Sequence, residues 1–382
     1  MSEISPYSEK ELLRLARRVN NPKRNYLLVN PLQGKHMPVD PEEALKMMQA
    51  LGKTVKSKRA GIPLVIGFSE TATAIGAAVA VELGEQCVYL QTTREQDDCV
   101  SRWVCFSEEH SHATEQKLCG DGLESRISAC DYVLLIDDEI STGKTILNTV
   151  SAIRKACPSA GEKEFVVASL INRVDKDHLE MFSREGVSFL YLLHLDAADF
   201  EERVEQYTVR EAEPPRIGKT DSDRQSIVQL SAVLPAPHRG VTSGEYARAC
   251  QRCADEILQK ADFAGGGSVL VLGTEEFMYP ALQLAARCRA EGAASSVKFH
   301  AVTRSPIGVS EEAGYPITNG IRLHSLYAPD RISYLYDLDS YDAVIVFSDA
   351  PRVIPEAVEE LQKGLEENHC RRIQFFFGGR HV

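Results

Sequence analysis

The chain has 382 residues, of which 43% are hydrophobic and 26% charged, with a net charge of −12 at neutral pH. This composition predicts a globular protein of about two domains, and no apolar run approaches the ~18 residues needed to cross a membrane. An acidic surface repels phosphate backbones, which argues against a nucleic-acid partner, and the N-terminus lacks the basic-then-apolar pattern of a signal peptide.

The ten cysteines form no complete metal-binding pattern. Without an export signal we expect reduced, cytoplasmic thiols. Cys250-x-x-Cys253 has no second CxxC to complete a tetrahedral zinc site. A second group has ligand residue types at irregular spacing: Cys99, Cys105, His110, His112 and Cys119. We therefore expect no structural zinc ion.

Apolar runs of strand length alternate with helical patterns through the first half of the chain. An amphipathic helix is expected over Ser8–Val19, and later helices over Thr73–Leu83 and Lys144–Ala156. Such alternation predicts a Rossmann-like parallel sheet covered by helices on both faces, with ligands beyond the carboxyl ends of its strands. The expected strands are Tyr26–Asn30, Leu64–Gly67, Val88–Gln91, Tyr132–Ile136, Phe165–Leu170 and Phe189–Leu193.

Proline-rich and charged residues interrupt this pattern between residues 208 and 239, where we expect a linker or an extended arm. A second α/β region follows, which predicts one domain over residues 1–207 and another over residues 240–382. The elements expected in this second domain are helix Gly244–Gln259, strand Ser268–Gly273, helix Tyr279–Glu291, strand Lys298–Val302, strand Ala343–Phe347, helix Pro355–Leu365 and strand Ile373–Phe377.

Three motifs of the first half have counterparts in the second. L-V-I-G-F-S-E (64–70) matches L-V-L-G-T-E-E (270–276), and T-R-E (93–95) matches T-R-S (303–305). D-Y-V-L-L-I-D-D, which starts at residue 131, likewise matches D-A-V-I-V-F-S-D, which starts at residue 342. Either the second half is a degenerate copy of the first, or a shared fold class alone produces the same order of motifs.

The stretch V-L-L-I-D-D-E-I-S-T-G-K-T, residues 133–145, ends like a nucleotide-binding P-loop. A P-loop needs a glycine five residues before the glycine of its G-K-T, because several backbone N–H groups must surround a polyphosphate. That residue here is Asp138, and it follows Asp137. Two carboxylates would repel a triphosphate, which excludes the P-loop interpretation.

The same residues suit a smaller ligand. Two acids at the end of an apolar strand can accept hydrogen bonds from a vicinal diol. The S-T-G-K-T turn opens a helix whose unpaired N–H groups favour a single phosphate, and Gly143 permits close approach of the backbone. A diol beside a monophosphate is the pattern of ribose 5-phosphate.

D-D-E-I-S-T-G-K-T resembles the phosphoribosyl pyrophosphate loop of type I phosphoribosyltransferases. The resemblance implies that Asp137 and Asp138 bind the 2′ and 3′ hydroxyls of ribose. G-F-S-E-T-A-T (67–73) resembles the pyrophosphate loop of the same family. The implied contacts of the 5′-phosphate are Glu139, Ile140, Ser141, Thr142, Gly143, Lys144 and Thr145, and those of the pyrophosphate are Ser69, Glu70, Thr71 and Ala72.

Other parts of the chain fit the same family. Arg94 is placed to neutralise pyrophosphate, the alternative being a solvated surface arginine. His110 and His112 fall where these enzymes carry a mobile lid, and plain loop histidines are the alternative. Lys35 and His36 fall where orotate phosphoribosyltransferases place an acceptor-binding hood, and an ordinary turn is the alternative there.

More narrowly, the chain resembles the bacterial phosphoribosyltransferases encoded with tellurite-resistance genes, which carry a C-terminal domain named for a Thr-Arg-Ser-Pro motif. That motif is present here, and Thr303, Arg304 and Ser305 are candidate ligand contacts of the second domain, with Arg304 expected to meet an anion. A structural turn is the alternative. The family implies a role in making a nucleoside-like metabolite.

This resemblance implies transfer of 5-phosphoribosyl from phosphoribosyl pyrophosphate to an acceptor that the family does not specify. We expect an orotate-like or other nucleobase-like small molecule as the acceptor, and a cytoplasmic homo-oligomer, a dimer, as the enzyme. Mg²⁺ would bind mostly through the substrate, with Asp137 and Asp138 as its protein ligands. Hypoxanthine–guanine enzymes carry an Asp as general base where this chain has Ser141, so purine salvage is not expected. The alternative is a regulatory protein that senses phosphoribosyl pyrophosphate without catalysis.

Overall fold

The computed structural model describes residues 7–19, 21, 24–107, 116–196, 198–216 and 226–380. The chain forms two compact units that interleave along the sequence, and each has its own parallel sheet. The first unit is built mainly from Leu45–Ala198 together with Pro235–Ala247. The second is built from Lys10–Ala44, Asp199–Leu234 and Arg248–Val382.

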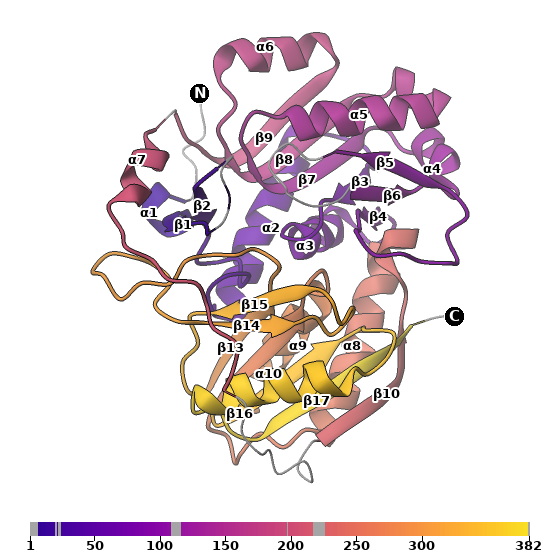
Figure 1. The fold of residues 1–382 in the computed structure, drawn as a ribbon. Helices are drawn as coiled ribbons and strands as arrows, with labels where there is room; N and C mark the ends of the chain where they lie inside the picture. The colour runs from indigo at the N-terminus through magenta and orange to yellow at the C-terminus, as the bar shows by residue number, and fades with distance from the viewer. Residues whose placement is uncertain are drawn as a thin grey trace. The chain divides into compact units, whose positions relative to one another are not determined.

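A six-stranded sheet forms the centre of the first unit (Figure 1). Five of its strands are parallel, and the short strand β11 joins one edge in the antiparallel direction. A separate antiparallel hairpin consists of β5 (Trp103–Phe106) and β6 (Gln116–Cys119). The order across the sheet is β11 (Val241–Thr242), β4 (Val88–Gln91), β3 (Leu64–Gly67), β7 (Val133–Ile140), β8 (Phe165–Asn172) and β9 (Val187–His194).

The helices of the first unit follow from their apolar patterns. α3 (Thr73–Leu83) consists largely of small apolar residues, is buried from Thr73 to Ala80, and packs against β3, β4 and β7. α5 (Lys144–Ala156) buries one stripe that includes Ile146, Val150 and Ile153, as expected of an amphipathic helix. The remaining helical elements are α2 (Pro41–Lys58), α4 (Leu123–Ala129), α6 (Lys176–Arg184) and the 3₁₀ turns η1 (Pro158–Glu162) and η3 (Pro237–Arg239).

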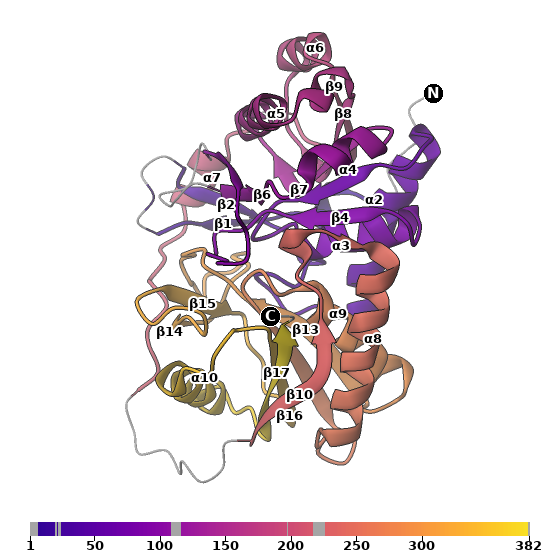
Figure 2. The same cartoon turned by 90° about the vertical axis from the view of Figure 1, so that its right-hand side faces the viewer.

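The second unit is built on a five-stranded sheet whose strands are all parallel. Helix α10 (Pro355–Glu367) covers one side of this sheet, and α8 (Ser243–Lys260) and α9 (Tyr279–Ala290) cover the other (Figure 2). The order across the sheet is β10 (Ser226–Leu234), β17 (Ile373–Arg380), β16 (Ala343–Ser348), β12 (Ser268–Thr274) and β13 (Ser296–Val302). Smaller elements are α1 (Glu9–Leu12), α7 (Phe200–Glu205), and the antiparallel hairpins of β1 (Arg14–Arg17) with β2 (Tyr26–Val29) and of β14 (Gly320–His324) with β15 (Ile332–Tyr336).

The two sheets share their strand order. β3 lies between β4 and β7 in the first unit, and β12 lies between β13 and β16 in the second. These are the strands that carry the matching sequence motifs, and β8 and β17 follow in the same place of each order. In each unit an antiparallel hairpin stands in the chain between the second and the third of these strands. The correspondence of motifs is therefore also a correspondence of topology.

Two expectations about local structure need correction. The helix expected over Ser8–Val19 is wrong, because the chain forms the one-turn helix α1 and then β1, which pairs with β2. The stretch expected to be a linker or arm contains β10, which pairs with β17 at the edge of the second sheet. In both places the deciding interaction is pairing with a strand outside the segment, which the periodicity of the segment itself does not reveal. Within the described residues no helix has the length and apolarity needed to span a membrane.

The G-K-H turn near the N-terminus is an interior feature of the second unit. Lys35 is fully buried, and its ammonium donates hydrogen bonds to the carbonyl oxygens of Glu275 (2.8 Å) and Val302 (3.0 Å), at the ends of β12 and β13. Burial, together with the charge of Lys35, lowers the pKa of the neighbouring His300 to about 4. His36 is buried as well. Neither Lys35 nor His36 offers a surface to an acceptor, which corrects the expectation of a hood at this turn.

Replacing Lys35 with Met should lower the free energy of unfolding by about 2–4 kcal/mol, because two buried carbonyl oxygens lose their charged donor. The loss would appear as a lower midpoint in thermal or urea unfolding. Lys53→Met, at an exposed position of α2, is the matched control and should leave the midpoint unchanged. A Lys35→Met variant with the parent midpoint but a raised KM for an acceptor would restore the hood interpretation.

Candidate functional site

The candidate site begins with the offset between β3 and β7. Gly67, the last residue of β3, pairs with Ile136 of β7. β7 then continues beside β8 as far as Ile140, which pairs with Asn172. The residues from Asp137 to Ile140 therefore extend past the end of β3, where the loop of residues 68–72 replaces the missing strand. The sequence analysis ended this strand at Ile136 and thus placed both acids after it, whereas they lie inside it.

Asp138 connects the two loops of the site. Its Oδ1 accepts a hydrogen bond from the hydroxyl of Thr71 at 2.9 Å, so a side chain of the loop after β3 contacts the acid of β7. The amide of Asp138 donates to Oδ1 of Asp137 at 2.9 Å. Burial, followed by the charge of Glu139, raises the pKa of Asp138. A carboxylate in such a place is stabilised by hydroxyl donors or a cation.

The third acid of this strand is paired within the protein. Arg173 directly follows β8, and its Nη1 lies 3.0 Å from Oε1 of Glu139. Both side chains are largely buried, with 14% and 11% of their surface exposed. This ion pair offsets one of three consecutive negative charges beside the expected phosphate site. The sequence analysis missed Arg173, although a cation just after the neighbouring strand was the available signal.

The turn between β7 and α5 requires a glycine for two separate reasons. Gly143 has a φ of 78°, in the left-handed region that glycine adopts without strain. A Cβ at this position would also collide with the ring of Phe182, which α6 brings over the turn. The amide of Lys144, the first residue of α5, donates to Oγ1 of Thr142 at 3.3 Å, and the N-cap residue Gly143 adds no side-chain cap. The first turn of α5 places its backbone N–H groups at the positive end of the helix dipole. That arrangement can bind one phosphate.

The loop after β3 is held from two sides by buried polar groups. The amide of Ser69 donates to Oγ1 of Thr92 at 2.8 Å, and the Ser69 carbonyl accepts from Nε2 of Gln116 at 2.7 Å. Thr92 and Gln116 also hydrogen-bond to each other. Thr92 follows β4 and Gln116 begins β6, so the loop is tied to both elements. The sequence analysis missed these two residues, because only their tertiary contacts distinguish them from ordinary polar residues.

Arg94 lies on the loop that follows β4, two residues after Thr92, and is partly buried. Its neighbour Thr93 exchanges backbone hydrogen bonds with Lys117 of β6 at 2.9 and 3.0 Å. The loops that carry Thr71 and Arg94 are therefore joined through Thr92 and β6. The lid candidates His110 and His112 lie outside the described residues.

At the corresponding strand ends of the second unit, after β12 and β13, the charged side chains form ion pairs with one another. Nη2 of Arg304 lies 2.9 Å from Oε1 of Glu276, and its Nε lies 3.6 Å from Oε2 of Glu275. Only 14% of the Arg304 side chain is exposed. Thr303 exchanges backbone hydrogen bonds with Tyr334, and the amide of Ser305 donates to the Thr303 hydroxyl at 3.2 Å. The expectation that Arg304 meets an anion is corrected, because two carboxylates of its own unit already surround it.

The loop between β14 and β15 adds to these contacts. The hydroxyl of Tyr327 donates to Oδ1 of Asp349 at 2.6 Å and lies 2.7 Å from Oγ1 of Thr274. Arg331 binds Oε2 of Glu275 at 2.9 Å, and the Ser325 hydroxyl also contacts that carboxylate. The polar groups that correspond to the candidate site of the first unit thus bind one another.

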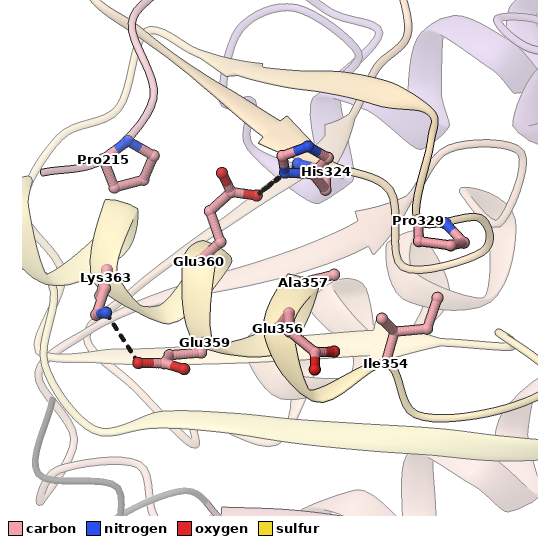
Figure 3. A pocket seen from close by; sticks show the side chains of 9 residues that line it. All are labelled: Pro215, His324, Pro329, Ile354, Glu356, Ala357, Glu359, Glu360 and Lys363. Atoms are coloured by element: carbon pink, nitrogen blue, oxygen red, sulfur yellow. Dashed lines mark hydrogen bonds and ion pairs between the residues drawn. The ribbon is translucent and has the colours of Figure 1, made fainter. Parts of the chain in front are cut away.

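A groove of about 490 Å³ is found on the second unit beside α10 (Figure 3). Its charged side chains are mostly paired, His324 with Glu360 at 3.0 Å and Lys363 with Glu359 at 2.8 Å. None of the site residues predicted from the sequence lines this groove. In the part of the chain that is described, no three His, Cys, Asp or Glu side chains gather as they would around a metal ion.

Comparison with protein families gives two matches. Residues 12–188 match the model described as phosphoribosyl transferase, and residues 240–365 match the model described as the TRSP domain C-terminal to it. No curated protein sequence matches the chain.

Solved structures resemble the chain only distantly. Adenine phosphoribosyltransferase from Giardia lamblia, complexed with 9-deazaadenine, is 19% identical, with a TM-score of 0.34, over 47% of this chain and 93% of its own. Orotate phosphoribosyltransferase from Mycobacterium tuberculosis, in complex with inorganic phosphate, is 18% identical, with a TM-score of 0.29, over 49% and 90%. From the two family matches, the chain joins a phosphoribosyl transferase domain to the TRSP domain that lies C-terminal to it in that family.

Proposed function

We propose that the first unit transfers a 5-phosphoribosyl group from phosphoribosyl pyrophosphate to a small acceptor and releases pyrophosphate. The observation that supports this most directly is the offset at the end of β7. It brings the acids Asp137 and Asp138, the start of α5 and the loop of residues 68–72 to one edge of the sheet. One diol, one phosphate and one pyrophosphate need binding groups of these three kinds.

In this proposal the acids of β7 bind the ribose. Asp137 and Asp138 accept hydrogen bonds from its 2′ and 3′ hydroxyls, and residues 139–145 bind the 5′-phosphate through backbone N–H groups and hydroxyls. The bond between C1 and the pyrophosphate oxygen then breaks, and its electron pair leaves with pyrophosphate. The acids stabilise the positive charge that develops on the ribose until the acceptor supplies a new electron pair at C1.

The loop after β3 and Arg94 serve the leaving group. Ser69, Glu70, Thr71 and Ala72 bind pyrophosphate mainly through their backbone, and the Arg94 guanidinium offsets its growing negative charge. The buried hydrogen bonds that Ser69 donates to Thr92 and accepts from Gln116 hold that backbone in place before the substrate arrives. Such preorganisation lowers the cost of arranging dipoles during the reaction.

The donor set near Asp138 fits Mg²⁺. Asp137 and Asp138 supply carboxylate oxygens, and a substrate supplies phosphate and hydroxyl oxygens, which is the combination that Mg²⁺ prefers over a cage of protein ligands. The raised pKa of Asp138 agrees with a carboxylate that a cation would stabilise. When bound, Mg²⁺ supplies charge neutralisation for the pyrophosphate.

The acceptor should need no proton removed by the phosphate loop. Ser141 stands where a purine-specific enzyme has its carboxylate base, and a serine hydroxyl does not accept a proton at neutral pH. An acceptor that is already anionic, as an orotate-like molecule is, matches this turn better than a neutral purine.

The double variant Asp138→Asn with Thr142→Ala should weaken binding of phosphoribosyl pyrophosphate by on the order of a hundredfold or more, because it removes a charged acceptor and a phosphate donor. Isothermal titration in the presence of Mg²⁺ measures this change. The melting temperature should remain near that of the parent, because an asparagine at position 138 keeps an oxygen that can accept the hydrogen bond from Thr71.

Asp177→Asn, at an exposed position of α6, is the control and should bind as the parent does. Parent-like affinity in the double variant would show that this loop is not the phosphoribosyl site. A parent protein that binds phosphoribosyl pyrophosphate but releases no pyrophosphate with any acceptor would instead favour the regulatory alternative.

Ser141→Ala should lower turnover only modestly, by roughly five- to thirtyfold, which corresponds to the ~1–2 kcal/mol of one phosphate hydrogen bond. Steady-state rates of pyrophosphate release measure the effect. A loss nearer a thousandfold, with a changed pH–rate profile, would mean that Ser141 takes part in proton transfer and that its role has been misread.

Gly143→Ala should both destabilise the protein and weaken phosphoribosyl pyrophosphate binding. The alanine methyl meets Phe182, and the left-handed backbone costs a non-glycine residue about 1–2 kcal/mol by itself. Gly161→Ala, where a Cβ meets no atom within 4 Å, is the matched control for differential scanning calorimetry. A Gly143→Ala variant that melts and binds like the parent would contradict the close approach described for this turn.

A further inference from the structure

A segment from beyond the phosphoribosyltransferase match completes the edge of the first sheet. Residues 235–247, the clamp segment, belong to the first unit although they follow the matched residues 12–188 by almost fifty positions. Within the clamp segment β11 pairs with β4, Val241 facing Tyr89 and Thr242 facing Val88. The ring of Tyr246 also stacks on that of Tyr89, with centroids 6.3 Å apart. The C-terminal half thereby supplies a strand to the sheet that carries the candidate site.

The clamp segment also binds the loop that carries Arg94. Asp97 of that loop accepts two hydrogen bonds from Arg239, one from Nε at 2.6 Å and one from Nη2 at 2.8 Å. Nε2 of His238 lies 2.6 Å from the same carboxylate. The side chains of Asp97 and His238 are each 10% exposed. A two-pronged arginine–carboxylate contact with restricted water access fixes geometry more strictly than a surface ion pair does.

The electrostatics of Asp97 agree with a firm contact. Burial alone would raise its pKa, but the hydrogen bonds from Arg239 and His238 outweigh burial and hold the pKa of Asp97 well below its usual range. The carboxylate therefore stays ionised through the physiological range, and the contact with Arg239 persists there.

Neighbouring residues hold the clamp segment in turn. Nη2 of Arg126, in the last turn of α4, donates to the carbonyl of Arg239 at 2.8 Å. The ring of Trp103 stacks on His238, with centroids 6.5 Å apart. The clamp thus rests on α4 and on β5 of the hairpin that also contacts the candidate site.

Asp97 governs the shape of its own loop as well. Its Oδ1 accepts from the amide of Cys99 at 3.0 Å, and its carbonyl accepts from the amide of Val100 at 3.0 Å. Thr93 is fixed on the opposite side by its backbone bonds to Lys117. The loop that carries Arg94 is therefore anchored on both sides of that residue. Thr93, before it, is bound to β6, and Asp97, after it, is bound to the clamp segment.

We propose that Arg239 and His238 of the clamp segment are positioning residues for the pyrophosphate subsite, acting through Asp97 on the loop of Arg94. The inference rests on the proposed function, because it takes Arg94 as the group that neutralises pyrophosphate. It gives the C-terminal half a part in the reaction that needs no ligand site of its own. The effect of the clamp segment on ligand binding should be selective, because it acts on the contacts of pyrophosphate and leaves those of the 5′-phosphate and ribose unchanged.

The test compares three ligands by isothermal titration with Mg²⁺ on the full-length protein: phosphoribosyl pyrophosphate, inorganic pyrophosphate and ribose 5-phosphate. Arg239→Gln should weaken the first two by roughly ten- to a hundredfold, because a misplaced Arg94 loses its contact with the leaving group, while ribose 5-phosphate changes by less than about twofold. The KM for phosphoribosyl pyrophosphate should rise in parallel. Arg59→Gln, which removes a similar ion pair to Glu164 elsewhere in the same unit, is the matched control and should change none of the three.

Arg239→Lys guards against a fold defect, because it keeps the positive charge and loses only the two-pronged geometry. It should reproduce the selective loss at a smaller size with the melting temperature of the parent. Equal weakening of all three ligands, or no weakening of any, would overturn the positioning role while leaving the proposed function intact. A parent protein that binds none of the three would instead overturn the proposed function itself, and the inference with it.

Discussion

The site of the first unit depends on one stagger in a parallel sheet. Because β3 stops at Gly67 while β7 continues to Ile140, three consecutive acids leave the cover of a neighbouring strand on one side and keep it on the other. The sheet itself cannot supply hydrogen-bond or ion-pair partners to carboxylates at such an edge. Their partners come from the segments that follow the neighbouring strands. The loop after β3 brings the hydroxyl of Thr71, and the residue after β8 brings the guanidinium of Arg173. Asp138 and Glu139 thus each bind a side chain from a segment that follows a neighbouring strand.

The second sheet repeats the strand order, but the polar side chains at the corresponding edge bind one another. There Glu275 meets Arg331 and Arg304, and Tyr327 reaches Asp349 across the ends of β12 and β16. Buried pairs of this kind give little net stability, yet removal of one partner leaves an unpaired charge at a large cost. The side chains at this edge are therefore held in their paired arrangement. The two halves resemble each other in the path of the backbone and differ in the chemistry at the strand ends.

The sequence predicted well what depends on neighbouring residues. α3 and α5 have the expected boundaries, because a run of small apolar residues and an amphipathic stripe are both local signals. The resemblance of residues 137–145 to a phosphoribosyl pyrophosphate loop could be seen because these residues are consecutive. What failed depends on partners outside the segment itself: β1 pairs with β2, β10 pairs with β17, and Lys35 binds carbonyls in a different part of the chain. The clamp on Asp97 belongs to the same class, since nothing about an isolated P-H-R-G stretch indicates which carboxylate it will meet.

The interleaving of the two units determines the order in which a growing chain can complete them. The first sheet has all but one of its strands after β9 is synthesised, yet its β4 edge stays unpaired until residues 241–242 emerge. Lys35 can bind the carbonyl of Glu275 only after the chain has grown by another 240 residues. Exposed strand edges and unpacked segments are the species that aggregate during folding, and contacts of such long separation form slowly. Translation of this protein thus passes through a long interval in which neither unit is finished, and a chain cut between the two family matches would leave both units incomplete.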